Sequence, residues 1–270
     1  MTGLPMDGAR RIETAIGAAR AAGRPAIAAF LTAGFPGRHG FGGVIATVAA
    51  EADLVELGVP FSDPMADGVT IQRASRAALA AGVTLEWILE TASDCGRGRP
   101  IVLMSYLNPL LAFGIDRMAR AARDAGVAGF VVPDLPFEEG GDLRDACDRA
   151  GLAVVQLVTP VTPDDRLGML CRASRGFVYA VTATGTTGGR VDTAEGVRRY
   201  LARVRAAARL PVLAGFGIRN PRQVRDLAGC ADGVVVGSAL VEELERGADP
   251  AAFLRGLRDA AGGRRAGDQR

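Results

Sequence analysis

The segment "LVELGVPFSDPMADG", residues 54–68, contains three carboxylates, of which only the first stands within an apolar run. Glu56 follows a valine and precedes a leucine, so a strand over this run would bury its carboxylate. A buried carboxylate without a partner is costly, so the position requires an explanation. Either an arginine pairs with Glu56, or Glu56 faces a pocket where loss of water raises its pKa and lets it transfer protons near neutral pH.

Further acids and two tyrosines follow at positions where strands are expected to end. Asp67, in "PMADG", is either part of an ordinary Asp-Gly turn or a second carboxylate at the same pocket. Asp63 is typical of a turn or a helix cap, and Asp134 lines either the pocket or a partner surface. Tyr106 and Tyr179 either donate a hydrogen bond to a catalytic acid or pack in the core.

Glycine-containing loops recur in the C-terminal part of the chain, as "TGTTGG" at 184–189, "GFG" at 215–217 and "GS" at 237–238. Glycines let backbone N–H groups approach an anion, and a following helix N-terminus adds partial positive charge. A single such glycine is better explained by a tight turn, but three loops together favour a phosphate site. Arg219 either adds charge to that site or faces solvent.

The basic residues restrict the chemistry further. The chain has no lysine, so all 32 basic residues are arginines, and its one histidine is His39. Without lysine, no Schiff base can form with a carbonyl substrate, and one histidine excludes the usual multi-histidine zinc sites. Acid–base chemistry by carboxylates on a phosphorylated substrate remains.

Composition indicates an ordinary globular protein, since 49% of the 270 residues are hydrophobic and 23% are charged. The net charge of +2 argues against nucleic-acid binding, and no apolar run approaches the roughly 20 residues needed to span a bilayer. Four separated cysteines and an N-terminus without a signal-peptide pattern predict a cytoplasmic protein. Residues 262–270 are rich in glycine and arginine and are expected to form a disordered tail.

Short apolar runs alternate with longer stretches of helical periodicity along the chain. Most of the runs are continuously apolar, as expected for parallel strands that are covered on both faces. The expected strands are 25–34, 54–60, 100–107, 129–135, 153–160, 176–183, 211–218 and 233–240.

Eight strands, each followed by a helix, are typical of a closed barrel. We therefore predict an α/β fold in which residues 1–270 form a single (β/α)8 TIM-barrel domain. An extra helix at about 8–23 is expected to cover the N-terminal end. An open doubly wound sheet rarely reaches eight regular repeats without a second domain. In a barrel, the chemistry lies at the C-terminal ends of the strands, where the acids and glycine loops stand.

Seven segments occur in a recognisable order: "LTAGFP", "VELGVPFSDPMADG", "IQRAS", "MSYLNPLLAFG", "VVPDLPFEE", "AGFGI" and "VVVGSAL". Together they closely resemble the alpha subunit family of tryptophan synthase, from about residue 8 to 260. The segment around Glu56 is the most specific, whereas other phosphate-binding barrels use turns like the last two.

The resemblance implies a lyase that cleaves indole-3-glycerol phosphate to indole and glyceraldehyde 3-phosphate, a retro-aldol reaction without metal or cofactor in this chain. In the family, Glu56 matches the mobile general acid and base, Asp67 matches the group that holds the indole N–H, and Tyr179 matches a supporting tyrosine. The remaining substrate-binding positions that match the family are Phe30, Ile71, Tyr106, Thr187, Gly188, Gly217, Gly237 and Ser238.

The resemblance also implies an α2β2 heterotetramer, in which the beta subunit carries pyridoxal phosphate. The segments at Asp63, Pro64 and "NPLLAFG" resemble the surface that meets that subunit. Two departures concern mobile loops, because Val69 stands where the family often has proline and Ala183 where arginine is frequent. The rival functions are a sugar-phosphate isomerase on the same barrel and a non-catalytic subunit that activates its partner.

Overall fold

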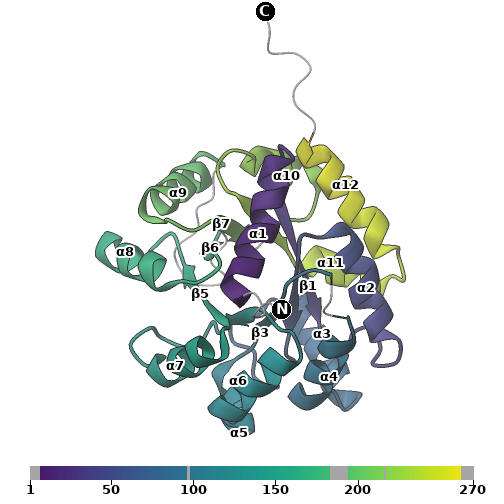
Figure 1. Cartoon of the computed structure of the whole chain (residues 1–270). Coiled ribbons are helices and arrows are strands. Elements are labelled where there is room, and N and C mark those ends of the chain that lie inside the picture. Colours follow the sequence, from purple (N-terminus) through teal and green to yellow (C-terminus); the bar gives the residue numbers. More distant parts are fainter. Residues whose placement is uncertain (1–6, 96–97, 183–193, 216, 263–270) are drawn as a thin grey trace, which may run out of the picture.

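The computed structural model describes residues 7–95, 98–182, 194–215 and 217–262. Its eight strands are all parallel and pair in chain order, and β8 pairs with β1 to close the barrel (Figure 1). This confirms the predicted TIM barrel. The strands are β1 (Ala26–Thr32), β2 (Leu54–Gly58), β3 (Ile101–Met104), β4 (Gly129–Val131), β5 (Ala153–Val158), β6 (Val178–Val181), β7 (Val212–Gly215) and β8 (Gly233–Val236).

Helices surround the barrel, and β2, β3 and β8 are each followed by two of them (Figure 1). The helices are α1 (Gly8–Ala21), α2 (Phe41–Glu51), α3 (Val69–Ala80), α4 (Leu85–Cys95), α5 (Leu107–Phe113), α6 (Ile115–Asp124), α7 (Gly141–Ala150), α8 (Asp164–Ala173), α9 (Ala194–Ala207), α10 (Pro221–Leu227), α11 (Ser238–Glu245) and α12 (Pro250–Gly262).

Helix α1 lies across one end of the barrel, as predicted (Figure 1). Asp7 caps it, because its Oδ1 accepts a hydrogen bond from the Ala9 N–H at 3.1 Å. Ile12 and Ile16 are fully buried and pack with the side chains that fill the barrel interior. A Cβ at Gly8 would lie 2.0 Å from the Ala128 carbonyl oxygen, so only glycine allows this close approach. The helix therefore closes the N-terminal end.

The strands separate two apolar clusters, one inside the barrel and one between the sheet and the helices. On β2, Leu54 belongs to the inner cluster, whereas Val55 and Leu57 belong to the outer one. Because side chains alternate along a strand, Glu56 points inward like Leu54. The sheet thus brings an acid into the barrel.

Most strands end earlier than the sequence predicts. The expected strand 233–240 stops at Val236, and Ser238 already begins α11. The same holds for 129–135, which is a strand only to Val131. Apolar residues continue beyond these strand ends because they line the mouth or pack under helices. Apolar composition therefore does not show where the hydrogen bonds between strands stop.

Buried carboxylates hold the N-terminal ends of neighbouring strands together. Asp53, just before β2, accepts a hydrogen bond from the Ile27 N–H of β1 at 2.9 Å. Arg24 donates two further hydrogen bonds to Asp53, at 2.6 and 2.8 Å. The Asp53 side chain is only 4% exposed, so these hydrogen bonds take the place of water around it.

We expect Arg24→Met to lower the free energy of unfolding by about 3 kcal/mol, because it strands the buried carboxylate of Asp53. Urea denaturation followed by circular dichroism measures the loss. Arg123→Met is the matched control, since Arg123 pairs with Asp124 in an exposed position and such pairs contribute little. Equal stability of the two variants would contradict this role for Arg24.

Two further expectations concern the whole chain. Among the described residues, no helix is long and apolar enough to cross a membrane. The expected tail at 262–270 lies outside the described residues, except for the residue that ends α12. A single domain over residues 1–270 stays a prediction.

Candidate active site

A cavity of about 110 Å³ lies at the C-terminal mouth of the barrel. The three segments after β2, β7 and β8 line it together with the inward side chains of four strands. Seven of the residues predicted from the sequence are among its lining residues. The lining consists of Phe30, Asp67, Ile71, Met104, Tyr179, Gly217, Ile218, Arg219, Val235, Gly237 and Ser238.

Glu56 lies behind this lining, inside the barrel, and is 2% exposed. It is level with Phe30 of β1 in the strand register. Its Oε1 has no hydrogen-bond partner in the described part of the chain. No arginine of the described residues forms an ion pair with it, which favours the pocket over the salt bridge. Desolvation, followed by repulsion from Asp67, raises the pKa of Glu56 to about 8.

Asp67 lies in the loop just before α3. The sequence left two alternatives for it, a turn residue or a pocket residue. It is both, because it precedes the helix and also lines the cavity. Burial raises the pKa of its carboxyl to about 6, and a hydrogen bond from Tyr106 opposes this rise. The Tyr106 hydroxyl also accepts a hydrogen bond from the Ala66 N–H at 2.9 Å. Tyr106 thus holds the Asp67 loop and is not itself a lining residue.

Tyr179 of β6 completes the group of titratable side chains. Burial raises the pKa of its hydroxyl well above its ordinary value, and the charges of Glu56 and Asp67 raise it further. Its ring packs on Gly215 of β7, where a Cβ would lie 2.4 Å from the tyrosine Cε1. The glycine therefore provides the space that Tyr179 occupies between the two carboxylates and the barrel wall.

The glycine turns after β7 and β8 form another part of the cavity. Gly217 adopts a φ of +86°, which favours glycine. Gln223 fixes this turn, because its Nε2 donates to the Gly217 carbonyl at 2.9 Å and its Oε1 accepts from the Arg219 N–H at 2.7 Å. Gly237 and Ser238 form the start of α11, so backbone N–H groups of a helix end face the cavity.

Thr187 and Gly188, which were also predicted to bind substrate, lie outside the described residues. Conversely, Met104, Ile218 and Val235 line the cavity although the sequence analysis did not single them out. Strand alternation could have identified Met104, because it stands two residues after the inward Val102.

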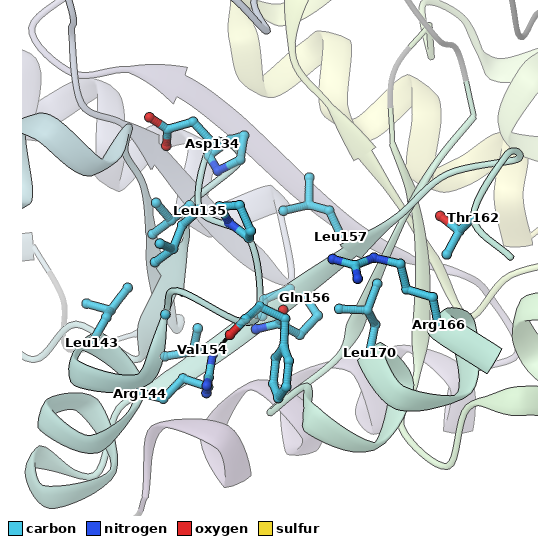
Figure 2. A pocket seen from close by; sticks show the side chains of 16 residues that line it. Asp134, Leu135, Leu143, Arg144, Val154, Gln156, Leu157, Thr162, Arg166 and Leu170 are labelled. Atoms are coloured by element: carbon cyan, nitrogen blue, oxygen red, sulfur yellow. Dashed lines mark hydrogen bonds between the residues drawn. The ribbon is translucent and has the colours of Figure 1, made fainter. Parts of the chain in front are cut away.

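A second cavity, of about 320 Å³, lies between α7 and α8 (Figure 2). Figure 2 shows Gln156 and Leu157 of β5 between Arg144 of α7 and Arg166 of α8. Asp134 lines this cavity and not the mouth cavity. Its Oδ1 accepts a hydrogen bond from the Leu107 N–H at 2.9 Å, so it stabilises the start of α5. Within the described residues, no group of three metal-ligating side chains gathers at either cavity.

The sequence agrees with one known family over nearly its full length. The family model described as tryptophan synthase alpha chain matches residues 16–259. The chain belongs to the tryptophan synthase alpha chain family. The relative from Nitratidesulfovibrio vulgaris Hildenborough is 44% identical over 250 residues, which cover 92% of this chain and 97% of the relative. The relative from Geobacter sulfurreducens is 46% identical over 249 residues, with coverages of 88% and 94%.

Solved structures of this family have the same architecture. Tryptophan synthase of Mycobacterium tuberculosis in space group F222 matches with a TM-score of 0.86 at 35% identity, covering 93% of this chain and 98% of that chain. The alpha subunit from Legionella pneumophila str. Paris matches with a TM-score of 0.84 at 30% identity and the same coverages.

Membership of the family confirms the function expected from the sequence. The chain is an enzyme subunit of the lyase class, and the tryptophan synthase alpha chain family catalyses the alpha reaction of tryptophan biosynthesis. A family of alpha chains also implies a beta subunit as partner.

Proposed function

We propose that the mouth cavity cleaves indole-3-glycerol phosphate, with Glu56 as general acid and base, Asp67 on the indole N–H and Tyr179 as a supporting group. The observation that carries this proposal is the carboxyl of Glu56, which is buried, has no hydrogen-bond partner at Oε1 in the part of the chain that the structure describes, and has a pKa of about 8. An oxygen without a partner among the described residues is available to a substrate in the cavity. A purely structural acid would have a partner.

The protonation states at neutral pH fit these roles. Since the pKa of Glu56 is about 8, its carboxyl carries a proton that it can donate to C3 of the indole ring. Since the pKa of Asp67 is about 6, it is ionised and can accept the hydrogen bond of the indole N–H. Two neighbouring carboxyls with separated pKa values thus divide the acid and base roles.

The cleavage then balances without lysine or metal. Protonation at C3 places the positive charge on the ring nitrogen, where Asp67 stabilises it. The glycerol hydroxyl next to the ring returns a proton to the Glu56 carboxylate and becomes an aldehyde. The bond between C3 and that carbon breaks, and its electron pair restores the aromatic ring. The indolenine ring is the electron sink that a Schiff base would otherwise supply.

Substrate contacts follow from the cavity lining. We assign the indole ring to Phe30 and Ile71, which are apolar and lie near Asp67, and the phosphoryl group to Gly217, Gly237 and Ser238. Thr187 and Gly188 belong to the same phosphate site by family resemblance, whereas Tyr106 acts by holding the loop of Asp67.

We further propose an α2β2 heterotetramer in the cytoplasm, with pyridoxal phosphate bound only by the beta subunit. Met65, next to Asp63 and Pro64, is 84% exposed, and Leu111 of "NPLLAFG" is 53% exposed. Between these two segments lies a hollow of about 470 Å³ that Phe61 and Phe113 help to line. Exposed apolar side chains of this kind are typical of a protein-binding surface.

The decisive experiment is an indole-release assay on the purified chain with indole-3-glycerol phosphate, with and without a tryptophan synthase beta subunit. We expect slow release by the chain alone and faster release in the complex. No release in either condition would favour the non-catalytic subunit, and conversion of sugar phosphates without indole release would favour the isomerase.

A further inference from the structure

Arg219 is the only cation among the described residues that line the mouth cavity. It lines that cavity together with Gly217, Gly237 and Ser238, where we place the phosphoryl group. Its side chain is half-exposed, and its Nη2 donates a hydrogen bond to Oε2 of Glu242. From the sequence, Arg219 could either add positive charge to the phosphate site or face solvent. In the structure it lines the cavity, and its guanidinium forms an ion pair with the Glu242 carboxylate.

Glu242 is engaged at both oxygens. Its Oε1 accepts a hydrogen bond from the Thr70 hydroxyl at 3.2 Å, and its other oxygen accepts from Arg219. The hydrogen bond from Arg219 is the main reason why the pKa of Glu242 is lowered. Thr70 lies in α3, three residues after Asp67. Glu242 therefore connects the turn after β7 with the helix that follows the Asp67 loop.

The position of Glu242 is unfavourable for an anion at the glycine turns. It lies on α11 four residues after Ser238, which is about one helical turn. A carboxylate there counteracts the positive field of the helix N-terminus, unless Arg219 neutralises it. A phosphoryl dianion bound at Ser238 would compete with Glu242 for the guanidinium, which binds phosphate oxygens in the same two-pronged manner as carboxylates.

We propose that Arg219 is a substrate-binding residue that transfers its hydrogen bond from Glu242 to the phosphoryl group when substrate enters the mouth cavity. This inference rests on the proposed function for its substrate, although the binding step can be measured without turnover. In this arrangement Glu242 holds the guanidinium beside the glycine turns and lowers the affinity for phosphate.

Opposite effects of two substitutions distinguish this proposal from a structural ion pair. Arg219→Gln removes the cation and should weaken binding of inorganic phosphate to the full chain about fivefold. Glu242→Gln frees the cation and should tighten binding about threefold. Arg222→Gln is the matched control, because Arg222 lies on the adjacent α10 and pairs with Asp226 in an exposed position. It should leave binding unchanged.

Isothermal titration calorimetry with phosphate measures these affinities. For the reaction, Arg219→Gln should raise KM for indole-3-glycerol phosphate and leave kcat nearly unchanged, and Arg219→Lys should restore part of the loss. Weaker phosphate binding in both Arg219→Gln and Glu242→Gln would mean a structural pair and would overturn the proposal. So would unchanged binding in Arg219→Gln, or no phosphate binding to the original chain. Failure of the original chain to release indole would instead reject the proposed function.

Discussion

Glu56→Gln should reduce indole release from indole-3-glycerol phosphate by about a thousandfold, within the range for loss of a general acid–base group. The amide keeps the shape of the side chain but can neither protonate C3 of the ring nor accept the hydroxyl proton. Because the carboxyl is buried and has no ion pair with the described residues, the substitution should leave the fold intact. Steady-state indole release at pH 7.5 measures the effect.

The same substitution should change the pH dependence of stability. The pKa of Glu56 is about 8 in the folded chain and 4.5 as its ordinary value. The folded chain therefore keeps a proton that the unfolded chain loses between these values, so the original chain loses stability as pH rises from 4.5 to 8. Glu56→Gln removes this loss. Its stability relative to the original chain should rise by about 3.5 kcal/mol between pH 5 and pH 8.

Urea denaturation at pH 5 and pH 8 tests this difference. Glu139→Gln is the control, because Glu139 is exposed and should change neither indole release nor the pH dependence. Near-normal indole release by Glu56→Gln, or an equal stability difference at both pH values, would contradict the role assigned to Glu56.

Asp67→Asn should lower kcat/KM for indole release by about a hundredfold, because it removes the negative charge that faces the ring nitrogen. In the original chain, activity requires Asp67 ionised and Glu56 protonated. Since their pKa values are about 6 and about 8, kcat/KM should follow a bell with limbs near these values. The limbs belong to the coupled pair, but only the acid limb should disappear in Asp67→Asn.

A pH–rate profile of kcat/KM between pH 5 and pH 9.5 measures both limbs. Asp63→Asn is the matched control in the same loop, since Asp63 is exposed and its carboxylate accepts a hydrogen bond from Ser62. It should keep both limbs. An acid limb near pH 6 that persists in Asp67→Asn would assign that titration to another group.

The sequence was sufficient for the barrel because each strand is a separate apolar run between amphipathic helices. It also singled out Glu56, because an acid inside an apolar run must be either paired or functional, and it left these two alternatives open. Strand ends were less predictable, since residues after β8 such as Ala239 and Leu240 stay apolar while already belonging to α11. Local composition shows which residues are buried, and buried residues continue beyond the last hydrogen bond between neighbouring strands.

Contacts between segments that are distant along the chain could not be predicted from the sequence. Tyr106 and Ala66 are 40 residues apart, and nothing local indicates that the tyrosine holds the Asp67 loop. The pairing of Arg219 with Glu242 depends on how α11 is rotated against the turn after β7. Such contacts follow from the packing of helices on the closed sheet, so they become visible only once that packing is known.

Ile12 and Ile16 of α1 close the N-terminal end of the barrel, so the cavity opens at the C-terminal end. Substrate therefore enters and product leaves at the C-terminal mouth of the barrel. A partner protein that covers the mouth would therefore receive the aromatic product as it leaves. The same partner would also control the entry of substrate. Helix α1, at the opposite end of the barrel (Figure 1), therefore directs the aromatic product toward a partner that covers the mouth.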